Sequence, residues 1–207
     1  MQQNSFFEKQ HVKNPEVPDS QCEAAGYVTA QSIVGTSKGR SKHDFYPTPA
    51  FATESLLEKE QFSGTILEPA CGDGAISKIL ESNGFSVSSS DLIDHGYGQT
   101  GQDFLNFIGP KYDNIITNPP YCLAEKFLDV ALETANHKVA LLLKLAFLEG
   151  IKRQKMFLNT PLARIHVFSK RLSFYRNGNK TKNSGMMAFA WFVWEKKYNG
   201  SVLVNWI

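Results

Sequence analysis

An apolar run that stops at two prolines constrains this chain more than any other feature. Residues Tyr112–Thr117 include two isoleucines and a threonine, which is typical of a buried parallel strand, and Pro119 and Pro120 follow after one residue. Proline lacks a backbone N–H and fixes φ, so the strand has to give way to a loop at its carboxyl end. In open α/β sheets that edge binds the ligand. The sequence therefore predicts a ligand-binding loop directly after this strand.

The predicted loop, Asn118-Pro119-Pro120-Tyr121, offers two acceptors beside an aromatic ring. The stiff prolines hold the Asn118 side chain and the Pro119 carbonyl in place, and Tyr121 projects just beyond them. A planar base with an exocyclic amine can donate to both acceptors while it stacks on the ring, which is the geometry that methylation of that amine needs. The alternative is an ordinary turn that ends a strand.

A glycine loop precedes this motif in the chain. Residues Thr65–Glu68 predict a first strand, Pro69–Gly74 a loop with two glycines, and Ala75–Ser82 a helix. A strand, a glycine loop and a helix let the backbone approach a nucleoside-bearing ligand closely. The alternative here is again a structural turn.

A second strand, Ser86–Asp91, ends in an acid that can accept hydrogen bonds from both ribose hydroxyls. Glu68 ends the first strand at a similar height. Two carboxylates are unfavourable beside a pyrophosphate, so they favour a nucleoside that has a positive charge and no phosphates. S-adenosylmethionine meets that description. Further on, Asp103 can receive an adenine amine and Phe104 can stack on the ring; the alternative for Asp103 is a helix N-cap.

The remaining pattern alternates helices and strands. Helices are predicted over residues 124–135 and 149–158, and a fully buried strand over 138–147. Strands are also predicted over 164–168, 186–195 and, as a short edge strand, 201–207, with a basic flexible loop over 170–185. His166 alternates with apolar neighbours, so we expect a packed histidine rather than a general base.

The length of 207 residues suits one α/β domain, residues 44–207, preceded by a flexible basic arm, residues 1–43. The longest apolar run is too short to span a bilayer and the start is polar, so we expect an intracellular protein. Three cysteines without C-x-x-C spacing or neighbouring histidines predict no metal site.

Charge is distributed unevenly along the chain. Residues 150–194 contain no acidic residue and nine basic ones: Lys152, Arg153, Lys155, Arg164, Lys170, Arg171, Arg176, Lys180 and Lys182. The remaining sequence carries 13 basic and 20 acidic residues. A polyanionic partner on this basic segment is the functional interpretation, and a solvated face is the alternative.

Taken together, the E-P-A-C-G-D-G loop from Glu68 to Gly74, the acid Asp91, the pair Asp103-Phe104 and the Asn118–Tyr121 motif resemble the class I S-adenosylmethionine-dependent methyltransferases that modify amino groups. The resemblance is strongest to small phage and prophage adenine-specific DNA methyltransferases. It implies a Rossmann-like α/β fold with a mostly parallel seven-stranded sheet, helices on both faces and a C-terminal antiparallel hairpin. It also implies a cytoplasmic enzyme of a bacterial or phage-infected cell that uses S-adenosylmethionine and DNA, needs no metal and has no tie to a membrane. No oligomeric state follows from it.

The resemblance also assigns roles to individual residues. Around the methionine part of the cofactor it places Glu68, Ala70, Gly72 and Gly74, with Tyr46 and Thr48 closing that end. Asp91 would bind the ribose and Leu92 would lie against the adenine, which Asp103 and Phe104 would also contact. Asn118 and Pro119 would bind the target amine, Pro120 would shape the loop and Tyr121 would stack on the flipped base. The residues expected to contact the substrate are Arg171, Arg176, Lys180 and Lys182.

The substrate stays open among three classes. Only a short tail follows the last aromatic strand, which leaves no room for a separate target-recognition region and predicts low or short sequence specificity. The same motif serves adenine methylation in RNA and glutamine methylation of release factors. A relative that binds nucleic acid without catalysis is the non-enzymatic alternative.

Overall fold

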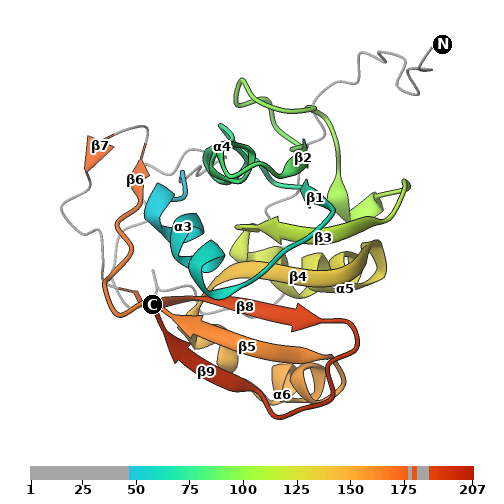
Figure 1. Ribbon diagram of the computed structural model, residues 1–207, viewed down its shortest axis with the longest axis vertical. Coiled ribbons are helices and arrows are strands. Elements are labelled where there is room, and N and C mark those ends of the chain that lie inside the picture. Colours follow the sequence, from blue (N-terminus) through green and yellow to red (C-terminus); the bar gives the residue numbers. More distant parts are fainter. Residues whose placement is uncertain (1–46, 177–178, 181–186) are drawn as a thin grey trace.

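The computed structural model describes residues 47–176, 179–180 and 187–207, and these form a seven-stranded sheet with helices on both faces (Figure 1). In chain order the elements are α3 (Ala50–Lys59), β1 (Thr65–Glu68), α4 (Ala75–Ser82), β2 (Ser86–Ser89), the 3₁₀ helix η1 (Phe104–Asn106), β3 (Tyr112–Thr117), the 3₁₀ helix η2 (Tyr121–Leu123), α5 (Ala124–Thr134), β4 (Ala135–Lys144), the 3₁₀ helix η3 (Leu145–Leu148), α6 (Ile151–Leu158), β5 (Leu162–Val167), β6 (Tyr175–Arg176), β7 (Asn179–Lys180), β8 (Phe189–Glu195) and β9 (Leu203–Trp206).

The strand order is β2-β1-β3-β4-β8-β5-β9. Strands β2, β1, β3 and β4 are parallel, while β8 runs antiparallel to both of its neighbours, β4 and β5. The edge strand β9 pairs in parallel with β5. A mostly parallel seven-stranded sheet with one reversed strand, and β5 with β8 as antiparallel neighbours, was predicted from the sequence and is confirmed.

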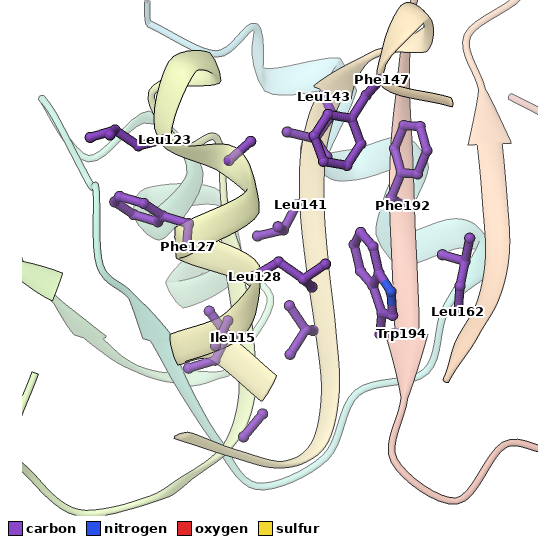
Figure 2. Packing of buried hydrophobic residues seen from close by; sticks show 14 of the residues in the cluster. Ile115, Leu123, Phe127, Leu128, Leu141, Leu143, Phe147, Leu162, Phe192 and Trp194 are labelled. Atoms are coloured by element: carbon purple, nitrogen blue, oxygen red, sulfur yellow. The ribbon is translucent and has the colours of Figure 1, made fainter. Parts of the chain in front are cut away.

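Both faces of the central strands are buried, and alternate residues serve opposite cores. On β4, Val139 and Leu141 face the core under α5, whereas Ala140 and Leu142 face the core under α3 and α4. Figure 2 shows the α5 side, where Leu128 of that helix lies against the β4 strand. A strand with both faces buried has to be apolar throughout, which is why this run lacks the polar alternation of a surface strand.

The aromatic strand β8 connects the sheet to helix α3, on the face opposite α5. Trp191 is fully buried, and its indole Nε1 donates a 2.7 Å hydrogen bond to the carbonyl of Ala52 in the first turn of α3. A buried indole N–H needs such a partner. The start of α3 is therefore tied to the centre of the sheet.

At the amino edge of the sheet, a buried ion cluster surrounds Glu60, which is 4% exposed. Its carboxylate receives hydrogen bonds from Lys138 at 2.8 Å, from Arg164, and from Nε2 of His166 at 2.9 Å. Arg164 also contacts Glu195. His166 is thus a packed histidine, as predicted.

The cluster corrects one premise about the basic segment. Nine basic residues were expected to lie unopposed, but Arg164 is neutralised inside the protein. Lys152 and Arg153 lie 3.0 Å and 3.7 Å from the carboxylate of Glu125 on α5. The acids come from sequence-distant elements, so the linear charge count could not reveal these pairs.

Some boundaries differ from the sequence-based ones. The strand predicted over 138–147 is β4, Ala135–Lys144, because its polar start pairs with β3 from Tyr112↔Ala135 onward, and the last predicted residues form η3 instead. The short β6–β7 pair lies within the loop predicted over 170–185. The predicted arm, residues 1–43, lies outside the described residues. Among the described helices, none is long and apolar enough to cross a membrane.

Candidate active site

The predicted site residues converge on the carboxyl edge of three neighbouring strands. In the sheet, β1 lies between β2 and β3, with Glu68 opposite Ser89 and Leu67 opposite Ile115. Glu68, Asp91 and Asn118 each stand at or just beyond the end of one of these strands. The topology alone therefore brings together residues that are far apart in the chain.

The loop between β1 and α4 depends on glycine at Gly74. This residue has φ +81°, and an added Cβ would lie 2.5 Å from the ring of Tyr97. A side chain at this position would be strained and would also clash. Tyr97 packs against the loop, and its hydroxyl donates to Glu81 of α4 at 2.9 Å. The glycine is needed for the close approach of Tyr97, whereas the predicted close approach to a ligand stays a prediction.

Asp91 braces this loop from the neighbouring strand. Its Oδ2 accepts a 2.8 Å hydrogen bond from the backbone N–H of Gly72, and its Oδ1 accepts one of 2.9 Å from the N–H of Ile93. A carboxylate has about four lone-pair sites, so each oxygen retains capacity for a ligand hydroxyl. Leu92 follows directly and is half-buried, and its contact with the adenine stays a prediction.

Glu68 is more enclosed than the sequence suggests. It is 1% exposed, and its Oε2 accepts hydrogen bonds from the backbone N–H of Ser77 at 2.8 Å and from the Ser77 hydroxyl. Burial, together with the nearby charges of Asp91 and Asp73, raises the pKa of Glu68 well above its ordinary value, although the Ser77 bonds oppose the rise. Glu68 holds the start of α4 against the end of β1.

The glycine loop sits in a negative electrostatic environment. Burial raises the pKa of the Cys71 thiol to about 12, and the charges of Glu68 and Asp91 contribute to the same shift. Burial, the largest cause of this shift, disfavours a charge of either sign, whereas the nearby acidic charges favour a cationic ligand group over an anionic one. This observation agrees with the chemistry of a sulfonium or an ammonium group and disagrees with that of a pyrophosphate.

Asp103 and Phe104 have different surroundings. Asp103 is exposed and caps η1, since its Oδ1 accepts from the N–H of Leu105 at 3.0 Å. Phe104 is 3% exposed and packs on Phe107 and Phe127 in the core under α5. The N-cap alternative for Asp103 is therefore observed. The ring of Phe104 packs in the core, and its expected stacking on an adenine stays a prediction.

The Asn118 side chain has a hydrogen-bond partner at its amide nitrogen but none at its buried oxygen within the described residues. Its Nδ2 donates a 3.1 Å hydrogen bond to the hydroxyl of Thr48. Its Oδ1 is buried and has no hydrogen-bond partner within the described part of the chain. A buried acceptor without a partner is costly, and such groups concentrate at functional sites. Pro119 is buried and Pro120 is exposed, so the motif turns outward after its first proline.

Tyr121 completes the site with an aromatic face. It is half-buried, its ring centre lies 5.8 Å from that of Phe189 at the start of β8, and the Lys144 ammonium lies 4.8 Å from its ring centre. Phe174 packs edge-on against Phe189 at 4.9 Å. A small group of aromatic rings and a cation thus border the two acceptors of the Asn118–Tyr121 loop.

Comparison with known proteins identifies this architecture. No family model matches the sequence. The chain is 30% identical over 105 residues to the modification methylase CviBIII of Paramecium bursaria Chlorella virus NC1A, an alignment that covers 42% of this chain and 28% of that protein. A Listeria monocytogenes protein described as a class I S-adenosylmethionine-dependent methyltransferase superposes with a TM-score of 0.56 at 18% identity, covering 77% of this chain and 65% of its own. A Vibrio vulnificus protein described as a modification subunit of a type I restriction enzyme superposes with a TM-score of 0.54 at 16% identity. This superposition covers 77% of this chain and 46% of the Vibrio protein.

The chain has the class I methyltransferase fold. The fold inferred from the sequence motifs is thus confirmed. The curated relative is much longer than the aligned part, since the chain spans 28% of its length.

Within the methyltransferase fold, three residues near the site were not predicted: Tyr97, Lys144 and Phe189. Lys144 and Phe189 are opposite each other in the β4–β8 ladder, and Lys144 ends a strand at the ligand edge. Its position at the end of a strand could have identified Lys144 as a candidate site residue. No sequence signal marks Tyr97, because its contact with Gly74 depends on the path of the loop after β2.

Several predicted site residues fall outside what the structure describes. Tyr46 and Lys182 lie outside the described residues, and the side chains of Arg176 and Lys180 are likewise undescribed. Arg171 is exposed. Ala70 is half-buried within the glycine loop. Among the described residues, no group of His, Cys, Asp and Glu side chains is arranged to hold a metal ion.

Proposed function

We propose that this protein transfers a methyl group from S-adenosylmethionine to the exocyclic amine of adenine in DNA. The observation that carries the proposal is the buried Oδ1 of Asn118, an acceptor that has no partner within the described chain and belongs to the same loop as Tyr121. The resemblance of the motif and the partial similarity to a viral modification methylase support the choice of DNA.

The residues around the glycine loop fit the cofactor. Gly72 and Gly74 give the loop its positive-φ path, and Asp91 retains lone pairs for ribose hydroxyls. Burial is the largest cause of the raised pKa of Cys71, and the acidic charges that add to the rise favour a cationic group there. S-adenosylmethionine supplies an electrophilic methyl group on a sulfonium when it is bound.

The Asn118–Tyr121 loop acts on the amine. An adenine amine is a poor nucleophile because its lone pair is delocalised into the ring. Asn118 Oδ1 and the Pro119 carbonyl accept its two hydrogens, draw them out of the ring plane and localise the lone pair on nitrogen. Preorganised acceptors of this kind act in the transition state more than in the ground state.

Tyr121 holds the base outside the duplex. Extrusion of a base costs a few kcal/mol, and stacking on an aromatic ring returns about 1–3 kcal/mol per base. The half-buried Tyr121 ring, supported by Phe189, provides such a face.

Adenine in RNA and the glutamine of a release factor are the competing substrates for this motif. A substrate panel separates them: the protein is incubated with tritiated S-adenosylmethionine and, in parallel, unmethylated duplex DNA, RNA or a release factor. We expect label on DNA, recovered as methyladenine after digestion to nucleosides. Label on a glutamine side chain with none on nucleic acid would reassign the substrate and leave the fold and the cofactor in place.

A further inference from the structure

We propose that Thr48 is a positioning residue for Asn118: its hydroxyl holds the carboxamide so that Oδ1 faces the target amine. This inference rests on the proposed function and assigns to Thr48 a role different from its expected place at the cofactor. The contact that motivates it is the 3.1 Å hydrogen bond from Asn118 Nδ2 to Thr48 Oγ1.

The two ends of a carboxamide have opposite hydrogen-bonding character. Oδ1 accepts hydrogens and Nδ2 only donates them. An amine target requires the oxygen, because two N–H groups that face each other repel and leave both unsatisfied. In the structure the donor end is occupied by Thr48 and the acceptor end is buried without a partner in the described chain. The carboxamide is thus already turned to the orientation that an amine requires.

Thr48 is well placed to act as an anchor. It is 7% exposed and lies between Pro47 and Pro49, which restrict its backbone to an extended conformation. Helix α3 begins immediately afterward at Ala50, and its first turn is tied to the sheet through Ala52 and Trp191. The hydroxyl is therefore supported by a rigid element rather than by a free loop.

The hydroxyl fixes the plane of the carboxamide, and the target amine then stabilises the flip that the structure shows. In the flipped form Oδ1 would accept from Thr48 and Nδ2 would point at the amine, which pairs donor with donor. Without the Thr48 hydroxyl the carboxamide is free to rotate, so fewer molecules present Oδ1 at the right place. Loss of such an anchor lowers the rate of the chemical step rather than the affinity for the cofactor.

The chain supplies a matched control. Thr53 on α3 is fully buried, and its hydroxyl has no hydrogen-bond partner within the described residues. Thr48→Val and Thr53→Val make the same change of a hydroxyl to a methyl group at two buried positions on the same stretch of chain. Only the first removes a hydrogen bond to Asn118.

The experiment compares wild type, Thr48→Val, Thr48→Ser and Thr53→Val. We expect kcat for methylation of duplex DNA to fall about tenfold in Thr48→Val, the effect of one hydrogen bond of ordinary strength, and to be restored in Thr48→Ser. Thr53→Val should keep the wild-type kcat. Calorimetry with S-adenosylhomocysteine should give the same Kd for Thr48→Val as for wild type.

A second readout does not depend on activity. In protein labelled with ¹⁵N-asparagine, the side-chain Nδ2 resonance of Asn118 should shift and exchange faster in Thr48→Val, and should stay in place in Thr48→Ser and Thr53→Val. If wild type methylates no substrate but this resonance responds, the proposed function fails and the anchoring stands.

Two results would overturn the inference. One is an unchanged kcat and an unchanged Asn118 resonance in Thr48→Val. The other is a weakened Kd for S-adenosylhomocysteine with kcat intact at saturating cofactor, which would place Thr48 in the cofactor site alone.

Discussion

The carboxylate of Asp91, just beyond the end of β2, receives the backbone N–H of Gly72 at 2.8 Å. An acid from one strand thereby sets the path of the glycine loop that follows its neighbour, before any ligand is considered. Asp91 therefore connects the glycine loop after β1 with the segment after β2, and both belong to the candidate cofactor site.

Replacement of Asp91 should therefore weaken cofactor binding. Asp91→Ala removes the acceptor for Gly72 and the lone pairs available to the ribose, so we expect a loss of about 1–3 kcal/mol in binding free energy. Calorimetry with S-adenosylmethionine measures it. Asp94→Ala is the matched control, because Asp94 is exposed and accepts the local N–H of Gly96 outside the glycine loop. Equal affinities of wild type and Asp91→Ala would remove Asp91 from the site.

Substitutions of Tyr121 should separate its ring from its hydroxyl. Tyr121→Ala removes the face beside Phe189, and we expect it to lose about 1–3 kcal/mol of base stacking and nearly all methylation. Tyr121→Phe keeps the ring and should keep substantial activity. Steady-state kinetics on duplex DNA gives the comparison. Loss of activity in Tyr121→Phe equal to that in Tyr121→Ala would assign the role to the hydroxyl instead.

The fold was accessible from sequence because its strands are apolar on both faces and end in recognisable breakers. Strands β1 and β3 and helix α4 were predicted with their observed bounds, since Gly64, the glycine loop and the two prolines mark where each one starts or stops. The start of β4 was missed because Asn136 and His137 are polar; they lie at a register shift between the pairs Tyr112↔Ala135 and Asn114↔Lys138, and the pairing of these flanking residues with β3 makes them part of the strand. Tertiary pairing outweighs local propensity at that point.

The ion cluster around Glu60 should make stability depend on acid pH. Burial alone would raise the pKa of Glu60, but hydrogen bonds from His166, Arg164 and Lys138 outweigh it and lower the pKa from 4.5 to about 2. Because the folded pKa is the lower one, this contribution is complete above about pH 4.5 and disappears as the pH falls toward 2. We expect it to amount to about 3 kcal/mol of unfolding free energy.

Urea unfolding as a function of pH tests this linkage. Glu60→Gln should lose about 3–5 kcal/mol at neutral pH, because Arg164 and Lys138 keep buried charges without their partner. Its stability should also change less between pH 4.5 and 2 than that of wild type. The same pH slope in both proteins would show that other carboxylates control acid unfolding.

The predicted DNA contacts should be visible in the salt dependence of binding. Replacing Arg176, Lys180 and Lys182 with alanine should weaken DNA binding and lower the slope of log K against log salt by about 0.9 for each phosphate that is no longer neutralised. Cofactor affinity should not change.

A control triple variant has the same change of net charge at the other edge of the sheet. Lys59 ends α3, and Lys196 and Lys197 follow β8, all at the edge opposite Asn118. Neutralising these three lysines should leave the salt slope as in wild type. The basic loop would be excluded from the interface if both triple variants changed the slope equally.

The site was accessible from sequence only where strand ends and motif order fix positions. Asn118, Asp91 and the glycine loop all follow the ends of neighbouring parallel strands, which motif order indicates, and their joint role in one site stays a prediction. The enclosure of Glu68 by Ser77, the core position of the Phe104 ring and the bond from Asn118 to Thr48 were not predicted. Each depends on side-chain packing between distant elements, which has no signature in residue order.

The central claim is that the Asn118 carboxamide acts on the amine of adenine. The most direct test is mass detection of methyladenine in nucleosides from unmethylated duplex DNA after incubation with S-adenosylmethionine and either wild type or Asn118→Ala. We expect methyladenine from wild type and about 10²- to 10³-fold less from Asn118→Ala, the usual cost of one preorganised hydrogen-bonding group, with calorimetric cofactor affinity unchanged. Methyladenine formed by Asn118→Ala at the wild-type rate, or none formed by wild type while a release-factor glutamine is labelled, would contradict the claim.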